Sequence, residues 1–139
     1  MNNISILLVE DNEADIMLTR EALLEGRLLK NIEVVRDGEE AIQYLDKTGR
    51  FANVQTPDLI LLDINLPRKN GFQILNYVKE SDHLKEILVI MLSTSSALKD
   101  KEKAFQGKAD LFITKPFESE EYAMVISVIE DCWMSAQKK

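Results

Sequence analysis

The sequence has very few of the residues that form disulfides or histidine-based sites. Among its 139 residues there is one cysteine, Cys132, and one histidine, His83. A single cysteine excludes an internal disulfide, and a single histidine excludes metal sites built from several histidines. Ile129 and Trp133 accompany Cys132 at helical spacing, which indicates a packing position on a helix. Polar residues surround His83, and we expect it to be exposed on a loop.

The sequence also lacks a long apolar run and an excess of basic residues. Its longest apolar runs are about half of a membrane span, and its start, MNNISILLVE, has no basic segment before the apolar stretch. We therefore expect neither a transmembrane helix nor a signal peptide, and a cytoplasmic location. Lysine and arginine total 17 against 24 acidic residues, a formal charge of -7. Because this charge repels phosphate backbones and anionic lipids, we expect no binding to nucleic acid or membranes.

The apolar residues that are present gather in short runs that end on polar side chains. Residues 59–62 are four consecutive aliphatic residues, which is typical of a strand buried on both faces. The run ends on Asp63, and a segment rich in asparagine and proline leads from there to Gly71. Apolar residues then return at helical spacing. Asp63 is therefore expected where a buried strand meets a loop, which is where ligands bind in open α/β sheets.

The same alternation extends along the whole chain. Further strands are predicted at residues 4–9, 32–35, 87–92 and 111–113. Helices are predicted from residue 13 towards Gly26, around residues 41–45 and 74–78, and over residues 97–106 and 119–136. Strands that alternate with helices through short loops form a parallel sheet with helices on both faces, so the expected fold class is α/β, a doubly wound five-stranded parallel sheet. A chain of 139 residues that is 45% hydrophobic suffices for one core.

Two of the expected helices have recognisable caps and apolar stripes. Asn12 is expected to cap the first helix and Ser119 the last. The buried stripes are expected to be Ala14, Met17, Leu18 and Ala22 in the first helix, and Tyr122, Val125, Ile126, Ile129 and Trp133 in the last. The last helix has a further apolar face, which is either buried more deeply than usual or covered by a partner: Met124, Val128 and Cys132.

Polar side chains end four of the predicted strands. Because the carboxyl ends of parallel strands meet at one edge of a sheet, the residues expected to converge there are Glu10, Asp11, Asp63, Ser93 and Lys115. Two carboxylates about 4 Å apart repel by on the order of 4 kcal/mol at an effective dielectric constant near 20, so three of them held together call for a cation. Oxygen donors without cysteine or histidine favour a hard ion such as Mg²⁺. The alternative is that these acids simply face solvent.

Other phosphate and metal sites fit the same residues less well. None of the five glycines forms a Walker phosphate loop. The loop EDNEAD after the first strand would repel the phosphate of FMN. Asp63 and Asn65 have the spacing of the aspartate-nucleophile phosphatases, but Asn65 cannot donate the proton that their second aspartate supplies. Pro67 occupies a ligand position of an EF-hand loop, which argues against a calcium site.

Taken together, the ends of the strands resemble those of a response-regulator receiver domain. The matching positions follow strands one, three, four and five: Glu10, Asp11, Asp63, Asn65, Leu66, Pro67, Gly71, Ser93, Lys115, Pro116 and Phe117. The resemblance covers the whole chain and implies a single receiver domain over residues 1–139 with no output domain, with flavodoxin-like strand order 2-1-3-4-5. The phrase LDINLPRKNG and the long segment before Pro57 resemble the receivers that partner cyanobacterial phytochromes.

The resemblance implies a metal site and a phosphoacceptor. Asp63 would receive the phosphoryl group. Asp11, Asp63 and the backbone carbonyl of Asn65 would bind Mg²⁺, and Glu10 would help through water. Glu10 stands where an aspartate is commoner in the family, but it retains a carboxylate.

The resemblance also implies contacts to the phosphoryl group and a switch. Ser93 and Lys115 would contact the phosphoryl oxygens, and Phe112 matches the aromatic switch position of the family. Phe112 lacks the hydroxyl of the tyrosine found in many members. In the family the peptide bond between Lys115 and Pro116 is cis, a geometry that costs little only before proline.

The implied function is signalling by phosphoryl transfer. A partner histidine kinase, of the phytochrome type if the closer resemblance holds, would phosphorylate Asp63, and the changed surface would carry the signal. The protein would not be an enzyme in the usual sense, because it would catalyse only its own phosphorylation and dephosphorylation. A homodimer through the last strand and helix is expected. The alternatives are an interaction module that works without phosphorylation and a passive phosphorelay intermediate.

Overall fold

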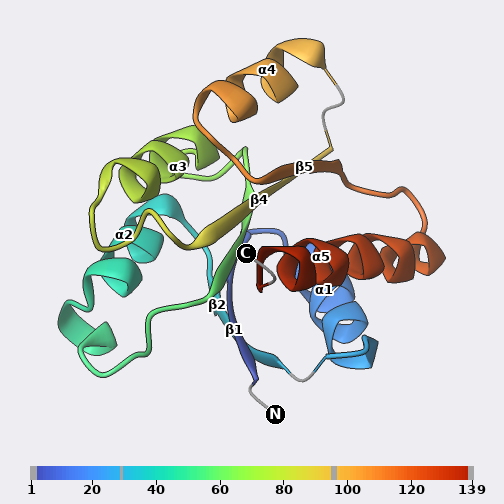
Figure 1. The fold of residues 1–139 in the computed structure, drawn as a ribbon, viewed down its shortest axis with the longest axis horizontal. Coiled ribbons are helices and arrows are strands. Elements are labelled where there is room, and N and C mark those ends of the chain that lie inside the picture. Colours follow the sequence, from blue (N-terminus) through green and yellow to red (C-terminus); the bar gives the residue numbers. More distant parts are fainter. Residues whose placement is uncertain (1–2, 29, 95–96, 138–139) are drawn as a thin grey trace.

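The chain folds as alternating strands and helices, and the computed structural model describes residues 3–28, 30–94 and 97–137. The elements are β1 (Ile4–Val9), α1 (Glu13–Glu25), β2 (Lys30–Val35), α2 (Gly38–Asp46), β3 (Leu59–Asp63), α3 (Gly71–Glu80), β4 (Leu88–Ser93), α4 (Leu98–Gln106), β5 (Leu111–Thr114) and α5 (Tyr122–Gln137) (Figure 1). Two short 3-10 helices accompany them in the described ranges, η1 (Gly49–Phe51) and η2 (Ser119–Glu121). The predicted strands and helices are confirmed, with small shifts at their ends. None of the helices within these ranges is long and apolar enough to cross a membrane.

The five strands form one parallel sheet in the order β2-β1-β3-β4-β5. The strand that carries Asp63 is therefore the central one. Its register places Leu62 beside Val9 of β1 and Asp63 beside Leu92 of β4. This arrangement confirms the predicted fold class and strand order, and it brings the carboxyl ends of β1, β3 and β4 to the same edge.

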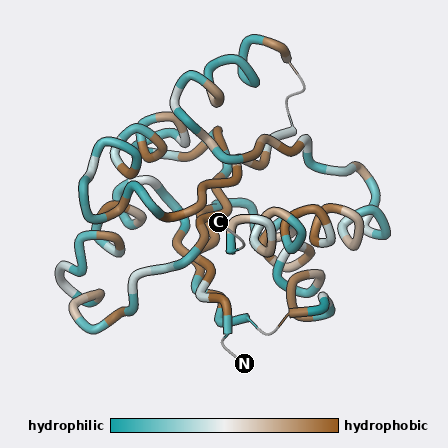
Figure 2. Tube along the Cα trace, viewed as in Figure 1, coloured by the Kyte–Doolittle hydropathy of each residue, from teal (hydrophilic) through white to brown (hydrophobic). Residues whose placement is uncertain are grey.

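Alternate residues of the strands build two separate cores. One lies against α2, α3 and α4 and includes Leu7, Val9, Ile60, Leu62, Val89 and Met91. The other lies against α1 and α5 and includes Ile6, Leu8, Leu59, Leu61, Ile90 and Leu92. Figure 1 shows the two groups of helices on opposite sides of the sheet, and Figure 2 shows the apolar strands between helices with mixed surfaces. Because both faces are covered, every residue of β1 and of β3 is buried, as their unbroken apolar runs predicted.

The buried face of α1 differs from the predicted one. Asn12 caps the helix as expected, since its side chain accepts a hydrogen bond from the backbone N–H of Asp15. The buried residues, however, are Ile16, Thr19 and Leu23, whereas Met17 of the predicted stripe is 57% exposed. Apolar residues occur on several sides of this helix, so spacing alone allowed more than one orientation. Packing against α5 and the sheet selected this one.

The start of α5 also corrects the sequence analysis. Ser119 is not the N-cap residue, because it lies inside η2, whose N-cap position is occupied by Glu118. Glu118 precedes it and forms a capping box with Glu121, each side chain accepting from the backbone N–H of the other residue. The predicted stripe of α5 is confirmed, with Tyr122, Ile126 and Ile129 buried, and Val125 and Trp133 packed partly against the same core. Of the further apolar face, Cys132 also packs partly against this core.

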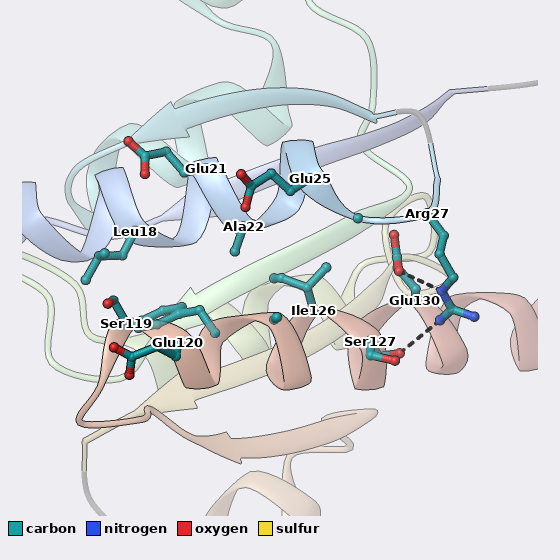
Figure 3. Close-up of a pocket in the computed structure, with 13 residues that line it drawn as sticks. Leu18, Glu21, Ala22, Glu25, Arg27, Ser119, Glu120, Ile126, Ser127 and Glu130 are labelled. Atoms are coloured by element: carbon teal, nitrogen blue, oxygen red, sulfur yellow. Dashed lines mark hydrogen bonds and ion pairs between the residues drawn. The ribbon is translucent and has the colours of Figure 1, made fainter.

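One charged residue of α5 is buried, which the apolar pattern did not reveal. Glu130 is 2% exposed and holds the end of α1 and the start of β2 against α5. Its carboxylate accepts hydrogen bonds from Lys30 Nζ at 2.6 Å, from the backbone N–H of Leu28 at 3.0 Å and from Arg27 Nε at 3.1 Å. The remaining donors of Lys30 Nζ reach the carbonyls of Leu23 at 2.8 Å and Leu28 at 2.9 Å. Figure 3 shows Arg27 joined to Glu130 beside the groove between α1 and α5.

The surroundings of Glu130 lower its pKa. Burial by itself works to raise the pKa, but the hydrogen bonds from Lys30 and Leu28 and the charge of Lys30 outweigh it. Because the folded pKa lies below the unfolded one, the carboxylate stabilises the fold fully above the unfolded value of about 4.3. This contribution is lost as the pH falls through the folded pKa.

We expect Glu130→Gln to lower the free energy of unfolding by about 2 kcal/mol near neutral pH, because Lys30 loses a charged partner. The difference from wild type should shrink as the pH is lowered from neutral through the depressed pKa of the wild-type carboxylate. Urea denaturation at neutral and at acidic pH measures it. Asp131→Asn is the matched control, since Asp131 is 65% exposed and pairs with Arg27 at the surface. An equal loss in both variants, or a loss that does not depend on pH, would contradict the assignment.

Candidate functional site

Three carboxylates gather at the carboxyl edge of the sheet, as the sequence predicted. Glu10 and Asp11 follow β1, and Asp63 ends β3. One carboxylate oxygen from each of the three lies within 4.8 Å of those of the other two. Glu10 is 2% exposed and Asp63 is 8% exposed, whereas Asp11 faces solvent. Two buried acids and one open to solvent leave the cluster accessible from one side.

Lys115 lies among these acids. It follows β5, and its side chain is 6% exposed. Its Nζ is 2.5 Å from Glu10 Oε1, 3.0 Å from Asp15 Oδ2 and 3.6 Å from Asp63 Oδ1. The ammonium therefore donates to Glu10 and Asp15 and lies just beyond hydrogen-bonding distance of Asp63.

Asp15 is a member of the site that the sequence analysis missed. Its position four residues after Asp11, in the first turn of α1, was interpreted only as a charge that favours a helix N-terminus. Asp15 stands in the first turn of a helix that starts shortly after β1, and this closeness in the chain to Glu10 and Asp11 was the available signal.

The electrostatics of the cluster follow from burial. Burial raises the pKa of Asp63, and the charge of Asp11 adds to this effect while Lys115 opposes it. Burial likewise raises the pKa of Glu10, against the opposing hydrogen bond from Lys115. For Lys115 burial works to lower the pKa, but the hydrogen bond to Glu10 and the charge of Asp63 raise it overall. The lysine therefore remains charged, whereas burial disfavours the charged forms of Glu10 and Asp63.

This donor set fits a hard divalent cation. It offers carboxylate oxygens from two strands, and Asn65, two residues beyond Asp63, is exposed at the same edge. No cysteine or histidine belongs to the group. A cation there would relieve the repulsion that burial intensifies, and oxygen ligands of this kind suit Mg²⁺ or Mn²⁺.

The loop after Asp63 is held by Gly71. The backbone N–H of Gly71 donates to the carbonyl of Ile64 at 2.8 Å. A Cβ atom on Gly71 would lie 2.4 Å from the Asp63 carbonyl oxygen, closer than atoms can approach. Asn70 then caps α3 in a capping box with Gln73. The glycine that the sequence analysis noted thus lets α3 start directly against the backbone of the candidate acceptor.

Ser93 and Phe112 lie on neighbouring strands beside the carboxylates. Ser93 ends β4 and is fully buried, and its carbonyl accepts a hydrogen bond from the backbone N–H of Lys115 at 2.7 Å. Phe112 pairs with Met91 of β4 and packs, half-buried, against the core that includes α3 and α4. The structure therefore brings Glu10, Asp11, Asp63 and Lys115 together, and the strand order places Ser93 on the strand beside Asp63 and Phe112 one strand further away.

The peptide bond between Lys115 and Pro116 corrects the expectation drawn from the resemblance. No peptide bond is cis within the part of the chain that the structure describes, and this bond is therefore trans. For a bond that precedes proline the two isomers differ by only about 0.5–1 kcal/mol, so the sequence alone does not decide between them.

The structure also tests the predictions for the single histidine and the single cysteine. His83 lies exposed beyond α3, where its Nδ1 is 3.0 Å from Ser81 Oγ. It takes no part in the carboxylate cluster. Cys132 is half-buried on α5, as its spacing indicated.

Comparison with known proteins agrees with this geometry. Residues 6–127 match the family model described as response regulator receiver domain. The chain is 34% identical over 129 residues to the response regulator Rcp1 of a Synechocystis species, covering 93% of this chain and 88% of that protein.

Solved structures give the same result. The phosphorylated cyanobacterial phytochrome response regulator RcpA is 40% identical with a TM-score of 0.90, and 96% of each chain is covered. The Mn²⁺-bound form of Rcp1 is 34% identical with a TM-score of 0.86 over 94% of each chain. With its fold, its carboxylate cluster and a family match over most of its length, the chain belongs to the response regulator receiver domain family.

Proposed function

We propose that this chain accepts a phosphoryl group from a partner histidine kinase onto Asp63, in a Mg²⁺-dependent reaction, and signals through the resulting change of its surface. The observation that carries the proposal is the position of Asp63. It is a buried carboxylate at the end of the central strand, 3.6 Å from a lysine ammonium and within 4.8 Å of two further acids. A phosphoacceptor needs this combination, because both the nucleophile and the transferred group are negatively charged.

Each residue of the site then has a role. The metal would be held by Asp11, Asp63 and the backbone carbonyl of Asn65, with Glu10 contributing through water, and when bound it offsets the charge of the transferring group. A carboxylate oxygen of Asp63 attacks the phosphorus atom while the bond between phosphorus and the donor imidazole nitrogen breaks. The imidazole leaves with the electron pair of that bond.

Ser93 and Lys115 would receive the phosphoryl oxygens. Lys115 needs to move little, since its ammonium already lies 3.6 Å from Asp63 Oδ1. The hydroxyl of Ser93 would donate a charge-assisted hydrogen bond, and the space that it leaves would accept the ring of Phe112. The chain would thus catalyse only its own phosphorylation and dephosphorylation.

The partners follow from the relatives and from the surface. RcpA is described as a phytochrome response regulator, which supports a phytochrome-type histidine kinase as the phosphoryl donor. We propose that the phosphoryl transfer takes place in the cytoplasm, because such kinases take the phosphoryl group from ATP. The formal charge of -7 supports a protein partner rather than nucleic acid.

We also propose that residues 1–139 act as one receiver domain and form a homodimer through β5 and α5. The relatives support the single domain, since the match covers 88% of the length of Rcp1. On α5, Met124 is 74% exposed and Val128 is 46% exposed, beside a stripe that already packs on the sheet. Association would bury this apolar face.

The first prediction is that Asp63→Asn abolishes phosphorylation. Incubation with acetyl phosphate and Mg²⁺ should add one phosphoryl mass to the wild type in intact mass spectrometry, and chelation should prevent the addition. Asp58→Asn is the matched control, because Asp58 lies just before the same strand and its backbone N–H and side chain bond Ser5. A phosphoryl mass on Asp63→Asn would show that the acceptor is another residue. If the wild type gains no such mass, the remaining interpretation is an interaction module that works without phosphorylation.

The second prediction concerns the switch. Ser93→Ala should still be phosphorylated, but the chemical shifts around Phe112 should respond several-fold less than in the wild type, because the hydroxyl that couples them is gone. NMR spectra with and without the phosphoryl group measure this response. Thr94→Ala removes the next hydroxyl along the chain, which is exposed, and serves as control. Equal responses in wild type and Ser93→Ala would rule out the coupling.

The third prediction concerns the dimer. A glutamate in place of Val128 should weaken association at least tenfold, since an apolar contact would then bury a charge. Sedimentation with Mg²⁺ and a phosphoryl mimic measures the association. Leu24→Glu is the control, because Leu24 is equally apolar and 63% exposed but lies on α1. A wild type that stays monomeric at high concentration rejects the dimer, and an unchanged dimer in the Val128 variant rejects this face.

A further inference from the structure

Asp15 makes a contact that the proposed reaction does not use. Its Oδ2 lies 3.0 Å from Lys115 Nζ, closer than the 3.6 Å between Lys115 Nζ and Asp63 Oδ1. The ammonium that should contact the phosphoryl group is therefore directed towards α1 rather than towards the acceptor. We infer that Asp15 is a positioning residue that holds Lys115 away from Asp63 until a phosphoryl group draws the ammonium across. This inference rests on the proposed function and adds a residue that regulates the same site.

The position of Asp15 is fixed by the start of α1. The side chain of Asn12 accepts a hydrogen bond from the backbone N–H of Asp15 at 2.9 Å. The backbone N–H of Asn12 in turn donates to Glu10 Oε2 at 3.2 Å. Glu10 and Asp15, the two acids that bond Lys115, are thus tied to each other through the cap of the helix. Their arrangement forms a preset acceptor for the ammonium.

The hydrogen bonds of Lys115 to Glu10 and to Asp15 differ in how easily they can be broken. Glu10 is buried with Lys115, and their atoms lie 2.5 Å apart. The Asp15 side chain is 27% exposed, and its bond is longer at 3.0 Å. Water can donate a hydrogen bond to the Asp15 carboxylate in place of Lys115. The buried Glu10 carboxylate is hardly accessible to water. An aspartyl phosphate carries up to about two negative charges where the Asp63 carboxylate carried one, so the bond to Asp15 should be the one that is exchanged.

Loss of the contact between Asp15 and Lys115 would change the surroundings of the first residue of α5. Tyr122, the first residue of α5, is 5% exposed. Burial raises its pKa, the charge of Asp15 raises it further, and the charge of Lys115 lowers it, so both side chains lie close enough to act on this ring. Tyr122 also lines the groove of about 440 Å³ between α1 and α5. Leu18 and Ala22 of the same lining are labelled in Figure 3. Movement of Lys115 therefore changes the charge that faces the contact between α1 and α5.

The test compares binding of a phosphoryl mimic to wild type and to Asp15→Asn. Asparagine keeps the shape of the side chain and removes the charge that competes for Lys115. We expect the apparent Kd for beryllium fluoride with Mg²⁺, measured by titration, to fall about fivefold, which is the size expected for a partly exposed charged contact. Glu13→Gln is the matched control. Glu13 lies in the same turn of α1 but is 73% exposed and pairs with Arg36, so its apparent Kd should equal that of the wild type.

A second measurement separates positioning from a general effect on the fold. In a Lys115→Met background, adding Asp15→Asn should no longer change the apparent Kd, because the residue on which Asp15 acts is absent. The ammonium resonance of Lys115 in the unligated protein should shift in Asp15→Asn and remain unchanged in Glu13→Gln. Asp15→Ser gives the same comparison if the asparagine variant does not fold.

The outcomes are distinguishable. An apparent Kd for Asp15→Asn that equals or exceeds that of the wild type overturns the inference and leaves the proposed function standing. A fivefold change that persists in the Lys115→Met background also overturns it, since the effect would not pass through Lys115. A wild type that binds no beryllium fluoride overturns the proposed function, and the inference with it.

Discussion

The contact between Lys115 and the buried carboxylates is the interaction on which the site depends. Glu10 and Asp63 end two adjacent strands and are both buried, so without a nearby cation their charges would repel strongly. Lys115 comes from beyond β5, at the far edge of the sheet, and donates to Glu10 at 2.5 Å. The same ammonium therefore offsets part of the negative charge of the acids and joins the last strand to the first. Phosphoryl transfer would use this charge a second time, because the group that it stabilises arrives at the same place.

A second buried ion pair fixes α5 at the opposite end of the sheet. Lys30 pairs in register with Ile4 at the start of β1, and its ammonium lies 2.6 Å from Glu130. Helix α5 begins shortly after Lys115 and is anchored by Glu130, which lies about halfway along the helix. Motion that starts at Lys115 should act mainly on the first turns of α5, where the exposed Met124 and Val128 lie. Close approach of the backbone supports this anchor, since a Cβ atom on Gly26 would lie 2.5 Å from Glu130 Oε2.

Most of the fold and the main members of the site could be predicted from the sequence. Unbroken aliphatic runs such as residues 59–62 have one structural solution in a chain of this length, a strand covered on both faces. Parallel strands then bring their polar ends to one edge whatever the details of packing. The face of α1 could not be predicted in the same way. Its apolar residues surround the helix, and contact with α5 decided that Ile16, Thr19 and Leu23 are buried while Met17 is exposed.

The sequence by itself determined which chemistry meets at the edge of the sheet: three acids, a hydroxyl and a lysine, each at the end of a strand. It did so because strand ends and helix caps are local features that residue type and spacing specify. Only the tertiary structure decided which acid holds the lysine, that Asp15 belongs to the site, that Glu130 is buried with Lys30, and that the bond before Pro116 is trans. These outcomes depend on distances of a few ångströms between segments far apart in the chain. Such distances are set by how the helices pack on the two faces of the sheet, which no local pattern records.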